Sequence, residues 1–586
     1  MGLFAFAAWM LEHPFLGIQH DSVLYTLFAL AKLHPDTLNA DVFLRLGSQD
    51  KFSLFSPIYA AAMSLFGMEH AAALLLVLSQ AALLACAWAL ARRLMRPLDA
   101  TLGTALLVLL PNEYGGGITF RYLEDFITAR VPAEALVVGA VLAAVTRRYW
   151  IAVALVVAAL LIHPVMGAAG AAFLLITFLV PRHPKPALAV AGVGFVAAVA
   201  IVMAIAPLGR VADVNWWFTI HSTSSYLFIT MWTPSDWSRT AVYLVILTLG
   251  SLAGATPLLR RICMGMLATL ACGALITLVF CDLLHVSLFI DLQAWRWLWL
   301  ADVLALTLAP AIVQDCWHRG DKGRVAVLAL AGAWIFRDLP VDLLLDAAAI
   351  ACAAAPAKWS QHPYWKLASV GACALLGLAI CLDVSTLYDY EPGAMVHGSA
   401  LLDRVRGLCV DGVLPGVAII ATWILMPRVA PAAALTAVVL CAWLIPFAWA
   451  SYTIPTYTPE LASRFAPWRA AIPDRAEVLW LHKPVATWYL LNRPSYWSDD
   501  QVAGAIFSRE KALLLQRRTT AVGTALKISR SDSLDLSGMR AVCADPDLKY
   551  IVSSSALAPT PLPPVTVDPT EVSGTVYLYR CTDLLS

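Results

Sequence analysis

Long apolar runs constrain this chain more than any other feature. Runs at 71–91, 187–206, 241–259 and 432–450 are each long enough to cross a hydrocarbon core of roughly 30 Å as a helix. Of the 586 residues, 60% are hydrophobic and only 13% are charged, too few polar groups to cover a soluble globule of this size. Because a backbone in lipid must satisfy its own hydrogen bonds, the expected fold class is an α-helical polytopic membrane protein.

The hydropathy pattern predicts about thirteen to fifteen transmembrane segments. They start near these residues: Met1, His70, Leu98, Glu134, Tyr149, Val165, Pro186, Arg239, Ile262, Ile290, Val325, Pro340, Leu367, Asp411 and Pro431. The first is short and has no basic flank, which fits a late start or an uncleaved anchor better than a cleaved signal peptide. Whether the native start lies upstream of Met1 stays open.

Basic residues assign the two sides of the membrane, because cytoplasmic loops collect Lys and Arg. One set of loops carries Arg92, Arg93, Arg147, Arg148, Arg260, Arg261, Arg319, Lys322 and Arg324, among others. The alternate loops, at 13–68, 111–133, 207–238 and 384–407, are rich in Trp, Tyr, acids and His, and we expect them outside. The chain thus divides into a transmembrane domain, 1–450, and an extracytoplasmic domain, 451–586, on a bacterial inner membrane.

The 451–586 tail has its own character. Short β-like runs at 478–482, 550–553 and 574–579 alternate with helical stretches such as 500–516, which predicts a small α/β domain. Cys543 and Cys581 are its only cysteines, and an oxidising compartment would let them pair across neighbouring strands. The sequence leaves that pairing open.

Candidate chemistry lies in the outer loops, where ionisable groups gather near the membrane. The first loop carries His20 beside Asp21, and later Asp50 beside Lys51. An acid and a base on such a loop suit a sugar hydroxyl and a phosphate. The alternative for Asp21 is an ordinary helix-capping acid.

The second outer loop contains two arginines, Arg121 and Arg130, interleaved with Glu124 and Asp125. The guanidinium fork matches phosphate oxygens, so this loop is a candidate phosphate-binding site. A locally salt-bridged helix is the competing interpretation.

Two further positions stand at outer ends of predicted segments. His163 precedes a proline that cannot continue the helix, although such a histidine is often only a hydrogen-bonded structural residue. Gln293 and Arg296 lie among Trp295, Trp297 and Trp299, which as a group also fit an interfacial belt. Arg296 runs against the positive-inside bias, so it calls for an anionic partner.

With these motifs, the layout resembles the GT-C superfamily of membrane glycosyltransferases, which take a sugar from a polyprenyl-phosphate carrier outside the membrane. The resemblance rests on Asp21, the Asp50–Lys51 pair, the second-loop acids with Arg130, His163-Pro164, Gln293 with Arg296, and the tail stretches 490–498 and 506–509. The tail lacks the WWD-type signature of oligosaccharyltransferases, which argues against peptide glycosylation.

The resemblance implies an inverting transfer with Asp21 as general base on the acceptor hydroxyl. It implies that the cations hold the donor phosphate (Lys51, Arg121, Arg130, Arg296) and that the polar residues position the acceptor (His20, Asp50, Glu124, Asp125, His163, Gln293). No cofactor is required, although the acids leave a divalent metal open. The acceptor would be a cell-envelope glycan, lipid or protein.

Two rival functions remain. An O-antigen polymerase or ligase usually carries its long outer loop between late segments, and a transporter or flippase of lipid-linked sugars predicts ionisable residues near the bilayer midplane. Here the charges cluster towards the outer ends, which favours an enzyme. A net charge of +1 gives no reason to expect a nucleic-acid partner.

Overall fold

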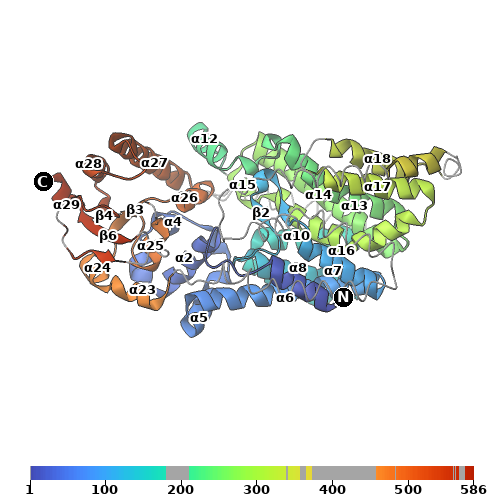
Figure 1. Ribbon diagram of the computed structural model, residues 1–586, viewed down its shortest axis with the longest axis horizontal. Helices are drawn as coiled ribbons and strands as arrows, with labels where there is room; N and C mark the ends of the chain where they lie inside the picture. The colour runs from blue at the N-terminus through green and yellow to red at the C-terminus, as the bar shows by residue number, and fades with distance from the viewer. Residues whose placement is uncertain are drawn as a thin grey trace.

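The computed structural model describes residues 2–179, 210–337, 341–356, 364–372, 457–481, 483–557, 560, 562–566 and 574–586. A body of helices occupies one end of the molecule, and a strand-containing C-terminal region occupies the other (Figure 1). The predicted outer loop 384–407 and the segments expected near residues 186, 411 and 431 lie outside the described residues.

The helical body follows the apolar pattern of the sequence. Its main helices are α1 (Gly2–Glu12), α2 (Ser22–Leu33), α5 (Phe55–Phe66), α6 (Met68–Leu94), α7 (Pro97–Leu109), α8 (Arg130–Val145), α9 (Tyr149–Ile162), α10 (Pro164–Leu174), α12 (Val214–Thr223), α13 (Pro234–Ala253), α14 (Pro257–Ile276), α15 (Ser287–Leu292), α16 (Leu298–Trp317), α17 (Asp321–Ile335) and α18 (Asp342–Ala354). In the described part of the chain up to α18, a helix therefore lies near each predicted segment start.

Three helical stretches of the described chain are long and apolar enough to cross a membrane: Met68–Leu94, Pro257–Leu283 and Ser287–Trp317. Several others are apolar but hold only 10–17 residues, among them Pro97–Leu109, Tyr149–Ile162 and Pro164–Leu179. A 14-residue helix is only about 21 Å long, so breaks such as His163-Pro164 leave each piece short of a full span. The structure is compatible with a helical membrane protein, with fewer full-length candidate spans among these residues than the sequence pattern suggests.

The stretch Ser287–Trp317 is the most buried of the three. Trp295, Trp297 and Trp299 on it are all buried. An interfacial belt would leave these rings exposed at the surface, so that interpretation is wrong. Gly115 packs directly against Trp295, because a Cβ on that glycine would lie 2.1 Å from the indole ring.

The C-terminal region contains a four-stranded sheet in the order β3-β4-β6-β5. Its strands are β3 (Glu477–Trp480), β4 (Leu548–Ser553), β5 (Val565–Thr566) and β6 (Thr575–Arg580), and its longest helix is α27 (Arg509–Ser529). β3 and β4 run parallel, whereas β6 is antiparallel to both of its neighbours. The three predicted β-runs correspond to β3, β4 and β6, while two-residue β5 gave no pattern to read.

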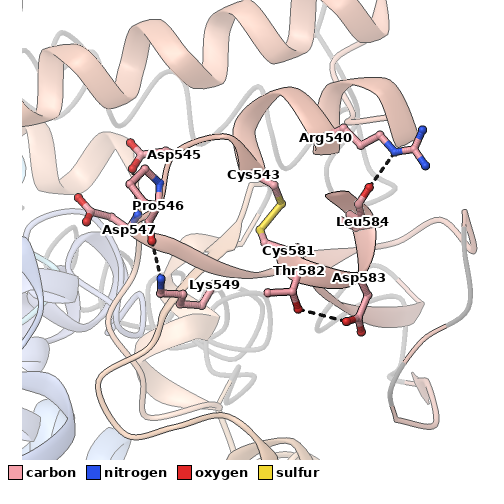
Figure 2. Close-up of a disulfide and its surroundings, with 10 residues drawn as sticks. All are labelled: Arg540, Cys543, Asp545, Pro546, Asp547, Lys549, Cys581, Thr582, Asp583 and Leu584. Atoms are coloured by element: carbon pink, nitrogen blue, oxygen red, sulfur yellow. Dashed lines mark hydrogen bonds between the residues drawn. A yellow bond between two sulfur atoms is a disulfide. The ribbon is translucent and has the colours of Figure 1, made fainter. Parts of the chain in front are cut away.

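Cys543 and Cys581 form a disulfide in this region (Figure 2). The bond joins the end of α28 (Leu536–Cys543) to the start of α29 (Cys581–Leu585). The sequence had suggested a bond across neighbouring strands instead. Beside it, the Arg540 side chain donates a hydrogen bond from Nε to the Leu584 carbonyl at 2.8 Å. The disulfide therefore holds the C-terminus against α28.

Replacing both cysteines by serine is expected to lower the free energy of unfolding. The bond closes a loop with a sequence separation of 38, for which the chain-entropy model gives about 4 kcal/mol. Thermal unfolding of the purified protein, compared with Cys272→Ser at an exposed free cysteine, measures the loss. Equal unfolding temperatures for the two variants would contradict the expectation.

Candidate active site

Asp21 stands at the N-terminal end of α2, but its carboxylate makes no capping hydrogen bond. Oδ2 instead accepts a hydrogen bond of 2.7 Å from Nη1 of Arg130, a residue 109 positions away in the chain. The Asp21 side chain keeps 28% of its surface exposed. The capping interpretation is therefore wrong: Asp21 presents one face to solvent and one to a buried guanidinium.

Arg130 begins α8 and is almost fully buried. Its Nε donates to Glu124 Oε1 at 2.7 Å, and its Nη2 lies 2.5 Å from the same oxygen. The Thr128 hydroxyl donates to the other oxygen of Glu124 at 2.5 Å. The local salt bridge proposed as an alternative therefore exists, between Arg130 and Glu124. The Arg130 guanidinium also binds Asp21, which belongs to a different loop. We call Asp21, Glu124, Thr128 and Arg130 the Asp21 network.

Arg296 adds a second buried guanidinium beside this network. It lies 3.9 Å above the ring of Phe120, and Arg130 lies 5.2 Å from the same ring. Nη1 donates to Gln293 Oε1 at 3.3 Å, whereas Nε and Nη2 have no hydrogen-bond partner in the described part of the chain. A buried cation with two unused donors is costly unless an anion joins it, so this position favours anion binding.

The pKa values of the two carboxyl groups of the network shift in opposite directions. Burial would raise the pKa of Asp21, but the adjacent Arg130 guanidinium, helped by His20 and Arg296, holds that pKa below its usual value. Burial raises the pKa of Glu124 despite its bonds to Arg130 and Thr128. Asp21 is therefore the ionised, solvent-facing acid, and Glu124 is the buried support for Arg130.

Two predicted residues flank the network without joining its hydrogen bonds. The His20 ring stacks on Phe126 with ring centroids 5.4 Å apart, and its Nδ1 lies 3.5 Å from Asp21 Oδ1. His163 is buried and its Nδ1 accepts the Met166 backbone N–H at 3.3 Å, capping α10. This contact fits the interpretation of His163 as a hydrogen-bonded structural residue. His20 lies beside Asp21 on its exposed side.

Other predicted residues have different partners. Arg121 pairs with Glu113 at 3.1 Å, and Asp125 pairs with His13 at 2.8 Å. Asp50 pairs with Lys32 at 2.7 Å, near the far end of α2 and roughly 16 Å of helix from Asp21. Lys51, next to Asp50, is exposed. The geometry therefore does not bring Arg121, Asp125, Asp50 or Lys51 into the Asp21 network.

Tyr25 and Phe120 also belong to this site, although neither was predicted from the sequence. Tyr25 is one helical turn after Asp21, is 3% exposed, and its hydroxyl has no hydrogen-bond partner among the described residues. The four-residue spacing from Asp21 was a usable signal, because such residues share a helix face. Phe120 carried no comparable signal, since its place between Arg130 and Arg296 depends on tertiary packing alone.

The C-terminal region contacts the first of the predicted outer loops through Asp41. This fully buried carboxylate caps α4 (Val42–Arg45) by accepting the Phe43 N–H. It also accepts hydrogen bonds from the Trp488 indole, the Ser495 backbone and the Gln501 side chain, at 2.7, 2.9 and 2.9 Å. Nearer to the network, the Tyr489 hydroxyl donates to the Val23 carbonyl at 2.8 Å. The loop that carries Asp21 is thus fixed to the C-terminal region.

Asp41→Ala is expected to destabilise the protein by on the order of 3 kcal/mol, because it leaves several buried donors without an acceptor. Thermal unfolding would measure the loss, with Asp36→Ala, an exposed acid in the same loop, as the control. A variant as stable as the control would show that water replaces the carboxylate.

The acids of the network do not offer an evident metal site. Within the residues that the structure describes, no three His, Cys, Asp or Glu side chains gather as possible ligands. Asp21 and Glu124 both direct oxygens at the Arg130 guanidinium, which pairs with each of them.

Comparison with known protein families, with curated proteins and with solved structures finds no match to this chain. The functional argument therefore rests on the site itself.

Proposed function

We propose that this protein is a membrane glycosyltransferase of the GT-C type, which moves a sugar from a polyprenyl-phosphate donor to a cell-envelope acceptor. The observation that carries the proposal is an ionised, partly exposed Asp21 beside two buried guanidinium groups, one of which has two donors without a hydrogen-bond partner among the described residues. An acid that can receive a proton, next to cations that can hold a phosphate, is what such a transfer needs.

In the proposed reaction, Asp21 accepts the proton of the acceptor hydroxyl as its oxygen bonds to the anomeric carbon. The bond from that carbon to the phosphate oxygen breaks, and its electron pair leaves with the polyprenyl phosphate. Attack from the side opposite the leaving group inverts the anomeric carbon. Arg296, with Arg130 beside it, stabilises the charge that develops on the phosphate, so no acid is needed to protonate it.

The ion pair with Arg130 makes Asp21 a weak base in the resting protein. A donor phosphate would compete for the Arg130 guanidinium, so that Asp21 gains basicity when the donor is bound. Because the phosphate is already a good leaving group, the acceptor proton can be lost late in the transfer, when even a weak carboxylate base is adequate.

The proposal includes the wider architecture: about thirteen to fifteen crossings in a bacterial cell membrane, with residues 451–586 outside. The Cys543–Cys581 disulfide supports the placement of that region, because disulfides persist in oxidising compartments.

One observation favours a second candidate, a transporter or flippase of lipid-linked sugars. Asp302 is buried at the midpoint of the span Ser287–Trp317, and its Oδ1 has no hydrogen-bond partner in the described part of the chain. The sequence led us to expect the charges at the outer ends of the segments, and Asp302 departs from that expectation. Ionisable groups at mid-membrane depth are typical of transport pathways.

Incubation of the purified protein in nanodiscs with radiolabelled polyprenyl-phosphate sugars and cell-envelope acceptors tests the proposal. A labelled glycan product with inverted anomeric configuration would support the transferase. Movement of labelled donor across proteoliposomes, with no transfer for any donor, would replace it with the transporter.

Arg296→Gln is expected to weaken donor binding and leave acceptor binding little changed. The loss of a charge-assisted contact corresponds to roughly ten-fold or more in donor KM. Arg319→Gln, at an exposed arginine on the opposite end of α16, serves as the control. A donor KM equal to that of the wild type would remove Arg296 from the donor site.

A further inference from the structure

Helix α12 carries an apolar face that the rest of the described protein leaves uncovered. Val211, just before the helix, and Val214 and Phe218 within it are 57%, 81% and 62% exposed. The four-residue spacing of Val214 and Phe218 places these two on one side of the helix, and Val211 lies just before it. Large apolar side chains gathered on one exposed face usually mark a contact surface.

The opposite side of α12 packs on the C-terminal region. The Trp216 indole N–H donates to the Ala505 carbonyl at 2.9 Å, and the Thr219 hydroxyl donates to Gln516 at 3.3 Å. Asp213 forms an ion pair with Arg509 at the start of α27. Figure 1 shows α12 between α27 and α15. One side of α12, which includes the fully buried Ile220, therefore packs on protein, whereas Val214 and Phe218 face outward.

The backbone places α12 at the end of two membrane spans. The Ala212 N–H donates to the His285 carbonyl at 2.9 Å, and Val211 forms a bridge with Val286. These partners lie in the short link between the spans Pro257–Leu283 and Ser287–Trp317. Leu283 and Leu284, in the same place, are 65% and 50% exposed. The exposed face of α12 is thus continuous with the apolar surface of a span.

We infer that α12 lies in the interface of the bilayer, with Val211, Val214 and Phe218 among the lipid acyl chains near the headgroups. An amphipathic helix at a span end buries its apolar face there. Arg210, exposed immediately before this face, is placed to meet lipid phosphates. Through Trp216 and Asp213, α12 then fixes the C-terminal region at a set height over the membrane. This inference is independent of the proposed transfer reaction.

Photocrosslinking to lipid tests the inference. The photoreactive residue p-benzoylphenylalanine is introduced at Phe218, an exposed aromatic position that tolerates it, and the full-length protein is placed in nanodiscs of phosphatidylethanolamine and phosphatidylglycerol. The control carries the same residue at Ile528, an apolar position of α27 that is 46% exposed and roughly 18 Å along the helix from Gln516. Peptide mass spectrometry after irradiation measures phospholipid adducts.

The expected result is a phospholipid adduct at position 218 and severalfold less at position 528. Equal adduct at the two positions, or no adduct at 218 with full protein recovery, would overturn the inference. A crosslink from 218 to a second copy of the chain, in place of lipid, would also overturn it by making this face a protein interface.

Discussion

The Asp21→Asn variant is expected to transfer sugar roughly 10²–10⁴-fold more slowly than the wild type, the usual contribution of a general base. The amide has nearly the same shape as the carboxylate and can still accept the Arg130 hydrogen bond, but it cannot take up the acceptor proton. Because Asp21 is partly exposed, the folded structure should tolerate the change. Rates measured at saturating donor and acceptor isolate the chemical step.

Asp36→Asn is the matched control, since Asp36 is an exposed acid of the same loop. It should transfer at the wild-type rate. Wild-type activity in Asp21→Asn would remove Asp21 from catalysis, even if the protein proves to be a glycosyltransferase.

The fold was predictable wherever one local pattern was sufficient. The apolar run 71–91 became α6, and the β-like run at 574–579 became β6. Span length was harder to predict, because each apolar segment was counted as one crossing although its helix can be too short to cross the membrane. His163-Pro164 divides one apolar stretch into α9 and α10, each too short for a full span.

The candidate site was predictable in part for the same reason. Asp21, Glu124, Arg130 and Arg296 are charged residues at the ends of apolar segments, so each attracted attention alone, and the structure brings them together. The prediction that neighbouring residues share one site was wrong where adjacent side chains point to opposite sides. Phe120 faces the two guanidiniums, whereas Arg121, the next residue of strand β2 (Phe120–Arg121), faces Glu113.

Arg130→Met tests whether the same ion pairs support both the fold and the reaction. Removing one partner of a buried ion pair typically costs about 3–5 kcal/mol, because the other charge is left unpaired in the interior. Here that charge belongs to Glu124, which is 1% exposed. The variant should unfold at a clearly lower temperature than the wild type and should transfer little sugar.

The double variant Arg130→Met/Glu124→Gln separates the two roles, because glutamine leaves no buried charge and can still receive the Thr128 hydrogen bond. We expect most of the lost stability to return while transfer stays low. If the double variant unfolds as early as the single one, the cost comes from lost packing and not from the unpaired carboxylate. Full transfer in the restored protein would show that Arg130 serves only the fold.

Both variants should also change how transfer depends on pH. In the wild type, Arg130 holds the pKa of Asp21 below its usual value, so Asp21 stays ionised near neutral pH. Protonation of Asp21 should therefore not lower the transfer rate in that range. Without Arg130, burial dominates and the pKa of Asp21 rises. Residual transfer should then decline on acidification at pH values where the wild-type rate is still level. Identical pH profiles for the two proteins would mean that Arg130 does not set the charge of the proposed base.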